Sequence, residues 1–456
     1  MIAPGEWLGL LGGGQLGRMF CHAAQSLGYR VVVLDPAAEG PAACVADAHV
    51  LAGYDDPTGL NKLAQRCRAV TTEFENVPAR SLESLSAHCR VTPGARAVEI
   101  VQDRIAEKSF VHGQGVPVAP YAPVRTRADL ADASGALFPG ILKVARLGYD
   151  GKGQARVRSR EEALAAFHEF GDVPCVLEAM LDLREELSVV LARGLDGECA
   201  VYPVACNVHH EGILAVTTVD GQSGPIARQA TDAALAIARG LDYHGVLCVE
   251  FFVLRDGRLI VNEIAPRPHN SGHYTINACV TSQFEQQARV MAALPLGSTR
   301  LLAPAVMLNI LGDAWYPNES DSQAEPDDQL DDDDRQVEPA DFLEDRLVAQ
   351  REPADDAREG ECEEHPDEGG SQPAREDLRL RVDPLDGSRG RVGHRHVSVH
   401  TLPSSAARLR SRASGSVRAR VVLVRGYQSA AIRTFTVPGT FAASGADGVP
   451  SARIDR

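Results

Sequence analysis

Two acidic residues, Glu250 and Glu263, lie within apolar stretches of the sequence, where a carboxylate is costly unless it is paired or bound to a metal. Glu250 belongs to the run Val246–Phe252. Glu263 ends the next apolar run, with Asn262 beside it. Oxygen ligands on two adjacent strands suit a Mg²⁺ ion that carries phosphates. The alternative interpretation is a charged cross-strand pair at a sheet edge.

A cationic and polar segment, residues 267–273 (RPHNSGH), follows this acidic pair. Arg267, His269 and Asn270 supply a guanidinium, an imidazole and an amide, which together suit a small anion beside a phosphoryl donor. A polar loop with incidental histidines is the alternative. The pair His209–His210 is a weaker signal, since a surface position would also explain it.

Two glycine-rich segments can bring backbone N–H groups close to an anion. Residues 12–17 (GGGQLG) follow an apolar run and open a helical pattern, which is the spacing of a dinucleotide-binding turn, although such a turn also binds other phosphates or nothing. Residues 148–154 (GYDGKGQ) follow the run that carries Lys143 and include Lys152. Lysines around a glycine loop suit a triphosphate, although a solvated hairpin would look similar.

The elements that must position these residues form two patterns. Strand and helix patterns alternate at the start of the chain, which predicts a parallel sheet with right-handed crossovers. The strands of this part are expected at residues 7–12, 31–34 and 69–74, and the helices at 15–27, 60–68, from 81 and from about 103. Antiparallel or mixed strands are expected later, at 140–145, 173–178, 186–192, 199–203, 246–254 and 258–263. The last two read as a hairpin, because residues 255–257 (RDG) favour a turn.

Composition limits the class of protein. The 456 residues include 24% charged and 44% hydrophobic residues, with a net charge of −16, which argues against a general nucleic-acid binder. No apolar run reaches the roughly 18 residues of a membrane span, and the first residues do not resemble a signal peptide. Ten scattered cysteines without a CxxC pair indicate reduced thiols in the cytoplasm rather than disulfides or a zinc site.

The end of the chain differs in composition from the rest. Residues 319–377 carry a net charge of −19 with one aromatic residue, so they are expected to be disordered. Residues 378–456 carry a net charge of +10 and are rich in Arg and Ser. They lack the regularly spaced apolar positions of a domain core, although Val421–Val424 could form a strand.

In combination, the motifs resemble the ATP-grasp superfamily and, more narrowly, the N5-carboxyaminoimidazole ribonucleotide synthetases of purine synthesis. The resemblance rests on residues 12–19 (GGGQLGRM), 73–78 (EFENVP), the pair Asp103-Arg104 with Lys108, and residues 148–154 and 262–273 (NEIAPRPHNSGH). A formate-using sister family typically has Asp-Thr-Gly where this chain has Asn270-Ser271-Gly272. The resemblance favours a ribonucleotide site over a dinucleotide site in the N-terminal domain.

The resemblance implies an α/β and α+β fold in four segments. A Rossmann-like substrate-binding domain is expected at 1–98 and an ATP-grasp domain at 99–312, followed by the acidic segment 313–377 and the tail 378–456. The tail stands where the family has a β-rich domain whose basic segment reaches the substrate phosphate. Only Ser388–His394 is similar to that segment. A shifted reading frame and a divergent extension would both explain this departure.

The resemblance also implies site residues and substrates. Bicarbonate and its carboxyphosphate product would be positioned by Tyr149, Lys152, Arg267, His269 and Asn270. Aminoimidazole ribonucleotide would contact Gln15, Leu16, Glu73 and Asn76, and Mg²⁺ would bind Glu250 and Glu263. ATP would be held by Arg104, Lys108, Lys143, Gly148, Tyr149, Asp150, Gly151, Lys152, Gly153, Gln154, Glu178, Ala179, Met180, Leu181, Glu186, His209, Asn262 and Glu263.

The expected enzyme is a cytoplasmic, homodimeric ligase. It would carboxylate aminoimidazole ribonucleotide with bicarbonate at the expense of ATP, with no membrane or nucleic-acid partner. The competing hypothesis is a catalytically impaired ATP-grasp body that binds ATP or acts as a scaffold through its charged tail.

Overall fold

The computed structural model describes residues 1–148, 153–210 and 212–310, together with four strands further along the chain. Two units are distinguished by their internal contacts. One comprises Met1–Gly312 with Val421–Thr434, and the other comprises Asp313–Arg420 with Phe435–Arg456. Among the described residues, no helix is long and apolar enough to cross a membrane.

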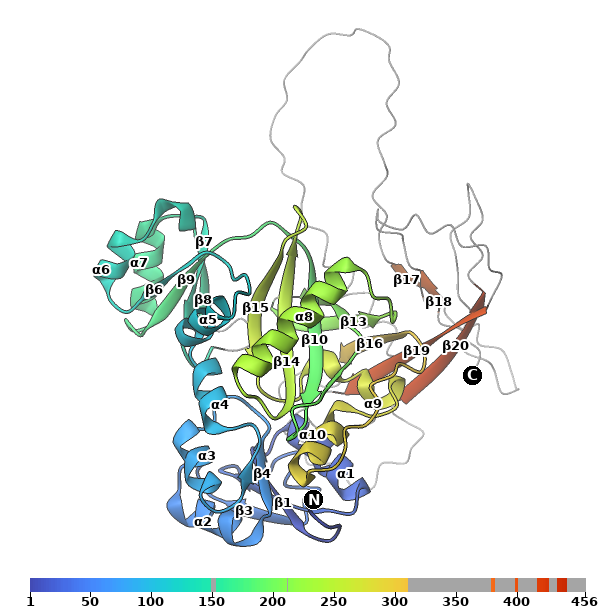
Figure 1. The fold of residues 1–456 in the computed structure, drawn as a ribbon. Coiled ribbons are helices and arrows are strands. Elements are labelled where there is room, and N and C mark those ends of the chain that lie inside the picture. Colours follow the sequence, from blue (N-terminus) through green and yellow to red (C-terminus); the bar gives the residue numbers. More distant parts are fainter. Residues whose placement is uncertain are drawn as a thin grey trace, which may run out of the picture. The chain divides into compact units, whose positions relative to one another are not determined.

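The N-terminal part is a five-stranded parallel sheet in the order β3-β2-β1-β4-β5, with helices between the strands (Figure 1). The Rossmann-like arrangement predicted from the sequence is therefore confirmed. Its strands are β1 (Trp7–Leu11), β2 (Arg30–Asp35), β3 (Ala48–Leu51), β4 (Ala69–Thr72) and β5 (Arg90–Val91). Its helices are α1 (Gln15–Ser26), α2 (Pro57–Arg66), α3 (Ala79–Ser86) and α4 (Ala95–Val101).

A small antiparallel sheet follows, in the order β6-β9-β7-β8. Its strands are β6 (Tyr121–Val124), β7 (Gly140–Val144), β8 (Gln154–Val157) and β9 (Cys175–Ala179). The helices of this part are α5 (Arg104–Gly113), α6 (Arg127–Asp132), η1 (Gly135–Leu137) and α7 (Arg160–Glu169). The side chain of Asp103 caps α5 by accepting hydrogen bonds from the N–H groups of Ile105 and Ala106, so this helix starts where the sequence predicts.

The larger antiparallel sheet runs in the order β15-β14-β10-β12-β13-β16 over residues 183–310, with β11 beside β10. Its strands are β10 (Leu183–Arg193), β11 (Cys199–Val201), β12 (Ala205–His210), β13 (Ile213–Val219), β14 (Gly245–Leu254), β15 (Leu259–Ala265) and β16 (Ala305–Ile310). The remaining helices are α8 (Pro225–Gly240), η2 (Asn270–Gly272), α9 (Thr275–Ala278) and α10 (Gln283–Ala292). The predicted hairpin is present as β14 and β15, and its turn residue Gly257 has a φ of +89° that favours glycine.

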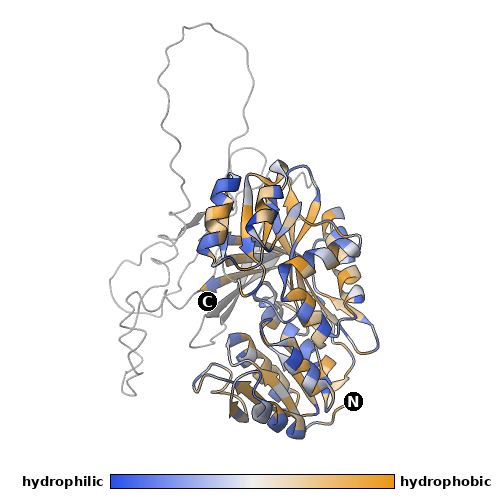
Figure 2. Cartoon of the chain, turned by 90° about the vertical axis from the view of Figure 1, so that its left-hand side faces the viewer, coloured by the Kyte–Doolittle hydropathy of each residue, from blue (hydrophilic) through white to orange (hydrophobic). Residues whose placement is uncertain are grey.

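Strand β14 is apolar except for Glu250, because both of its faces are covered. Leu247 and Val249 belong to the apolar cluster that includes α8, whereas Val246 and Cys248 belong to the cluster that includes α10. Figure 2 shows hydrophobic residues along the strands and a mixture of hydrophobic and hydrophilic residues on the helices. Glu250 follows Val246 and Cys248 in the strand's alternation, so its carboxylate lies on the face toward residues 267–273.

Four strands are described beyond residue 310: β17 (Arg379–Arg381), β18 (Ser398–His400), β19 (Ser416–Arg425) and β20 (Arg433–Thr440). Strands β17 and β18 pair antiparallel. The segment Val421–Val424, which the sequence marks as a strand, lies within β19. The acidic segment 319–377 and the basic segment Ser388–His394 lie outside the described residues.

Candidate active site

Two carboxylates lie opposite each other at the centre of the site: Glu250 is buried and Glu263 is half-buried. Glu250 and Glu263 are register partners across β14 and β15, next to a β-bulge. Burial, together with the negative charge of Glu263, raises the pKa of Glu250 to about 8. Burial also opposes ionisation of Glu263, but the nearby positive charges, of which Arg104 is the largest contributor, together lower the pKa of that carboxyl. Its Oε2 lies 3.1 Å from Arg104 Nη1.

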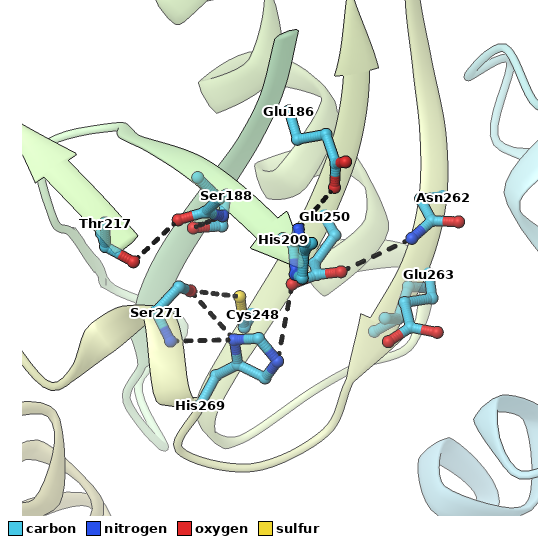
Figure 3. A network of polar contacts seen from close by, with 12 residues as sticks. Glu186, Ser188, His209, Thr217, Cys248, Glu250, Asn262, Glu263, His269 and Ser271 are labelled. Atoms are coloured by element: carbon cyan, nitrogen blue, oxygen red, sulfur yellow. Dashed lines mark hydrogen bonds and ion pairs between the residues drawn. The ribbon is translucent and has the colours of Figure 1, made fainter. Parts of the chain in front are cut away.

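Polar side chains from three further strand positions surround Glu250 (Figure 3). Asn262 Nδ2 donates to Glu250 Oε2 at 3.5 Å. His209 Nδ1 lies 2.8 Å from Glu186 Oε2. Burial would lower the pKa of His209, but the hydrogen bond and charge of Glu186 raise it above the ordinary value. Strands β10, β12, β14 and β15 thus bring Glu186, His209, Glu250 and Asn262 together.

The loop after β15 places a neutral imidazole next to the carboxylates. His269 Nε2 lies 3.6 Å from Glu250 Oε1. Its Nδ1 accepts a hydrogen bond from the N–H of Ser271 at 3.3 Å and lies 2.9 Å from the hydroxyl of Ser271. Burial lowers the pKa of His269 to about 4, so the ring is neutral at physiological pH. Because Nδ1 accepts the hydrogen bond from Ser271, the proton is assigned to Nε2, the nitrogen that faces Glu250 (Figure 3).

A second group of buried charges lies on α5 and the small sheet. Lys108 Nζ and Lys143 Nζ lie 3.2 and 3.3 Å from Glu178 Oε2. Although burial opposes ionisation, the two ammonium groups lower the pKa of Glu178. Arg104 and Lys108 are one helical turn apart on α5, so a single helix supplies cations toward both Glu263 and Glu178. This arrangement concentrates positive charge in a largely water-excluded region, which suits a polyphosphate.

The first glycine loop is occupied by carboxylates of the chain itself. Glu73 accepts hydrogen bonds from the N–H of Gly14 and, at 2.6 Å, from the N–H of Gly17. Asp35 accepts from the N–H of Gly13 at 2.6 Å. A Cβ atom at Gly12, where φ is +114°, would clash with the side chain of Glu73, so glycine is required. The amides that hold a pyrophosphate in dinucleotide-binding proteins are therefore engaged internally, which argues against the dinucleotide interpretation.

An ion pair joins the N-terminal domain to the loop that follows β15. Arg267 Nε donates to Glu75 Oε2 at 2.5 Å, and Arg267 Nη1 donates to the carbonyl of Pro268 at 3.1 Å. Burial opposes ionisation of Glu75, but the guanidinium lowers the pKa of its carboxyl. Among the described residues, no hydrogen bond is made by Arg267 Nη2, which leaves that edge of the guanidinium for an anion.

Family models match the two parts of the body separately. A ribonucleotide synthetase preATP-grasp domain matches residues 6–102, and an ATP-grasp domain matches residues 109–284. The first range holds the glycine loop with Glu73, and the second holds Lys143, Glu250 and Glu263.

Relatives match across both parts. The N5-carboxyaminoimidazole ribonucleotide synthase of Brucella melitensis is 46% identical over 316 residues, which cover 68% of this chain and 87% of the relative. That of Bacillus subtilis is 43% identical over 317 residues, covering 69% and 83%. The chain belongs to the N5-carboxyaminoimidazole ribonucleotide synthase family.

Solved structures of the N5-carboxyaminoimidazole ribonucleotide synthase family have the same fold. An ADP complex of one synthetase superposes with a TM-score of 0.66 at 42% identity, covering 69% of this chain and 84% of that one. A synthase from Aspergillus clavatus, in complex with ADP and 5-aminoimidazole ribonucleotide, superposes with a TM-score of 0.62 at 32% identity, covering 68% and 82%. The resemblance inferred from the sequence motifs is confirmed.

The other residues that the family resemblance implies are spread over several elements of the chain. Gln15 and Leu16 begin α1, and Asn76 lies in the loop between β4 and α3. Asn270 begins η2 and is exposed, and Gly153 (φ +72°) precedes Gln154 of β8. Gly148 ends the described part of the loop after β7, and Ala179, Met180 and Leu181 follow Glu178 at the end of β9. Tyr149, Asp150, Gly151 and Lys152 lie outside the described residues.

Three polar residues that bind parts of the site were not predicted from the sequence. Glu75 pairs with Arg267, Glu107 accepts from the N–H of Ile264, and Ser271 binds His269. Glu75 and Ser271 lie inside the quoted motifs, yet their partners are set by the tertiary structure. Glu107 is 3% exposed, and burial raises its pKa to about 7. Its position three residues after Arg104 in a helical pattern is the only signal in the sequence that could have indicated it.

Proposed function

We propose that this chain carboxylates 5-aminoimidazole ribonucleotide with bicarbonate, using ATP, to give N5-carboxyaminoimidazole ribonucleotide, ADP and phosphate. One observation carries the proposal. The paired carboxylates Glu250 and Glu263 lie beside cations suited to a polyphosphate, and Arg267 joins this group to the segment of Glu73 and Glu75. A phosphoryl donor, a small anion and a substrate of the N-terminal domain can therefore meet at one place.

ATP is assigned to the cations on α5 and the small sheet. Arg104, Lys108 and Lys143 would hold its phosphates, aided by residues 148–154. Because Lys108 is only 2% exposed and already pairs with Glu178, a bound phosphate would exchange one anionic partner for another. Residues 178–181, Glu186 and His209 would contact the adenosine.

The carboxylate pair fits Mg²⁺ bound together with phosphates. Among the described ranges, no cluster of three or more His, Cys, Asp or Glu side chains could hold a metal by itself. Mg²⁺ commonly uses one or two carboxylates and takes its other ligands from substrate phosphates and water. Burial and, after it, the charge of Glu263 raise the pKa of Glu250, and a bound cation would favour its ionised form. Glu250 and Glu263 would hold the ion, with Asn262 beside them, and the ion would disperse charge on the transferring phosphoryl group.

Bicarbonate is assigned to the loop after β15. Arg267 and Asn270 would bind it, and the Nε2–H of His269 would donate a hydrogen bond to it, with Tyr149 and Lys152 completing the set. A bicarbonate oxygen attacks the γ-phosphorus of ATP, the bond to the ADP oxygen breaks, and carboxyphosphate forms. The substrate amine then attacks the carboxyl carbon, directly or after release of CO₂, and phosphate departs with the bridging oxygen.

The ribonucleotide is assigned to the N-terminal domain. Gln15 and Leu16 of the glycine loop would contact it together with Glu73, which binds the loop, and Asn76. The pair Glu75–Arg267 connects this segment to the bicarbonate loop. The segment that holds the substrate phosphate in the family corresponds at best to residues 388–394, which lie outside the described residues. A homodimer, as in the family, is part of the proposal and is tested by light scattering.

The proposal is tested by the release of ADP from Mg-ATP with and without the ribonucleotide and bicarbonate. We expect ADP release to require both substrates, because neither alone completes the reaction. Equal release with and without the ribonucleotide would support the competing hypothesis of an impaired ATP-binding body.

A further inference from the structure

Helix α5 directs three consecutive charged positions of one face toward the site. Arg104 pairs with Glu263 at 3.1 Å, and Lys108 pairs with Glu178 at 3.2 Å. Between them lies Glu107, which is buried and has no role in the reaction as described so far. Its spacing of three and one residues from the two cations places it on the same side of the helix.

Glu107 binds the backbone of the strand that carries the metal carboxylate. Its Oε1 accepts a hydrogen bond from the N–H of Ile264 at 2.6 Å, directly after Glu263. Strand β15 stands at the end of the sheet order, and an edge strand leaves N–H groups without a strand partner. A second such group on β15, the N–H of Val261, donates to the carbonyl of Pro117 at 2.9 Å. The edge is therefore fixed by contacts from outside the sheet.

We propose that Glu107 is a positioning residue that fixes Glu263 relative to Arg104 and Lys108 by anchoring the backbone of β15 to α5. This inference rests on the proposed function, because it assumes that Glu263 binds Mg²⁺ and the two cations bind ATP. The role requires a hydrogen-bond acceptor of the correct length at residue 107. It does not require a negative charge, since a neutral side-chain carbonyl accepts the same bond from Ile264.

The test compares three substitutions at this position. Glu107→Gln keeps the length and the acceptor, Glu107→Met keeps the length without a comparable acceptor, and Glu107→Asp keeps the carboxylate but shortens its reach. Mg²⁺ binding to the full-length, ADP-loaded protein is measured by calorimetry, together with ribonucleotide binding and the thermal unfolding temperature. The same Gln and Met substitutions at Glu99, an exposed residue of α4, are matched controls.

We expect Glu107→Met and Glu107→Asp to weaken Mg²⁺ binding about tenfold, the effect of losing one buried hydrogen bond, with ribonucleotide binding unchanged. Glu107→Gln should retain Mg²⁺ binding within about twofold. If the Glu107→Met variant does not fold, Mg²⁺ binding by the Glu107→Asp variant tests the inference. Unchanged Mg²⁺ binding in a folded Met or Asp variant, an equal defect in Gln, or a parallel loss of ribonucleotide binding would overturn the inference. Because these readouts need no turnover, they remain distinct from failure of the proposed reaction.

Discussion

Glu250 and Glu263 face each other across two paired strands, yet their environments shift their pKa values in opposite directions. Glu263 has Arg104 at 3.1 Å, whereas Glu250 is buried next to a carboxylate. Glu263 is therefore already ionised and able to bind a cation, whereas Glu250 must first lose a proton.

This difference predicts a pH dependence of metal binding. Because the pKa of Glu250 is about 8, this carboxyl is mostly protonated at pH 6.5, and a proton competes with Mg²⁺. Mg²⁺ affinity, measured by calorimetry on the ADP complex, should rise as the pH increases toward 8, by up to about tenfold per pH unit, and then level off. Proton release on binding, measured in buffers of different ionisation enthalpy, should shrink in Glu250→Gln. An affinity independent of pH between 6.5 and 8 would contradict the assignment.

Removing the charge of the second carboxylate should stop catalysis. Glu263→Gln keeps the size of the side chain but removes an anionic ligand and the partner of Arg104. The loss should raise the barrier by roughly 4 kcal/mol, about a thousandfold in turnover. Circular dichroism should show an intact fold, and the exposed control Glu198→Gln should retain activity. Wild-type turnover in Glu263→Gln would place the metal ligands elsewhere.

The internal hydrogen bonds of the glycine loop predict which ligands it accepts. NAD⁺ should show no saturable binding, because Glu73 and Asp35 already occupy the N–H groups of Gly13, Gly14 and Gly17. Glu73→Ala should raise the KM of the ribonucleotide at least about tenfold, as expected when buried N–H groups lose their acceptor, with the KM of ATP unchanged. Tight NAD⁺ binding to the unmodified protein would favour the dinucleotide interpretation instead.

The pair Glu75–Arg267 predicts a requirement for a guanidinium rather than any cation. Arg267 donates to Glu75 through Nε and has a second edge of its guanidinium for an anion. A lysine side chain has a single nitrogen and no such second edge. Arg267→Lys should therefore raise the KM of bicarbonate by about tenfold or more and leave the KM of ATP nearly unchanged. Arg68→Lys, which alters the exposed pair with Glu6, is the matched control. A similar bicarbonate KM in both variants would remove Arg267 from the site.

The centre of the site could be predicted from the sequence because the signals that indicate it are local. Carboxylates inside apolar runs are detectable without a structure, and the hairpin of β14 and β15 explains why Glu250 and Glu263 meet. The fold of the N-terminal domain followed from its strand–helix alternation. In contrast, Glu75 and Arg267 are separated by 192 positions, and nothing in either segment specifies the other.

Other features depend on chain geometry that no local pattern encodes. Glu107 accepts a hydrogen bond from an N–H of the edge strand β15, and this contact is seen only when α5 is packed against β15. The bulge next to Glu250 and the one next to His209 shift the register by amounts that alternation of apolar residues does not predict.

The composition of the end of the chain predicts how it responds to proteases. The net charge of −19 over residues 319–377 predicts rapid proteolysis there, leaving a resistant fragment that ends near residue 315. The fragment should bind Mg-ATP as the full chain does, since every assigned nucleotide ligand precedes residue 274, but should bind the ribonucleotide weakly. Mass spectrometry of the digest and calorimetry on the fragment provide the measurement. A protease-resistant tail that contacts the substrate phosphate through Arg389 and Arg391 would contradict it.

The fate of the bicarbonate oxygens tests the central claim most directly. With ¹⁸O-labelled bicarbonate, Mg-ATP and the ribonucleotide, each turnover through carboxyphosphate transfers one bicarbonate oxygen to inorganic phosphate, which mass spectrometry detects. We predict phosphate carrying one ¹⁸O, formed together with the carboxylated ribonucleotide and only when the ribonucleotide is present. Unlabelled phosphate released at the same rate without the ribonucleotide would mean that water attacks ATP, and the proposed carboxylation would be wrong.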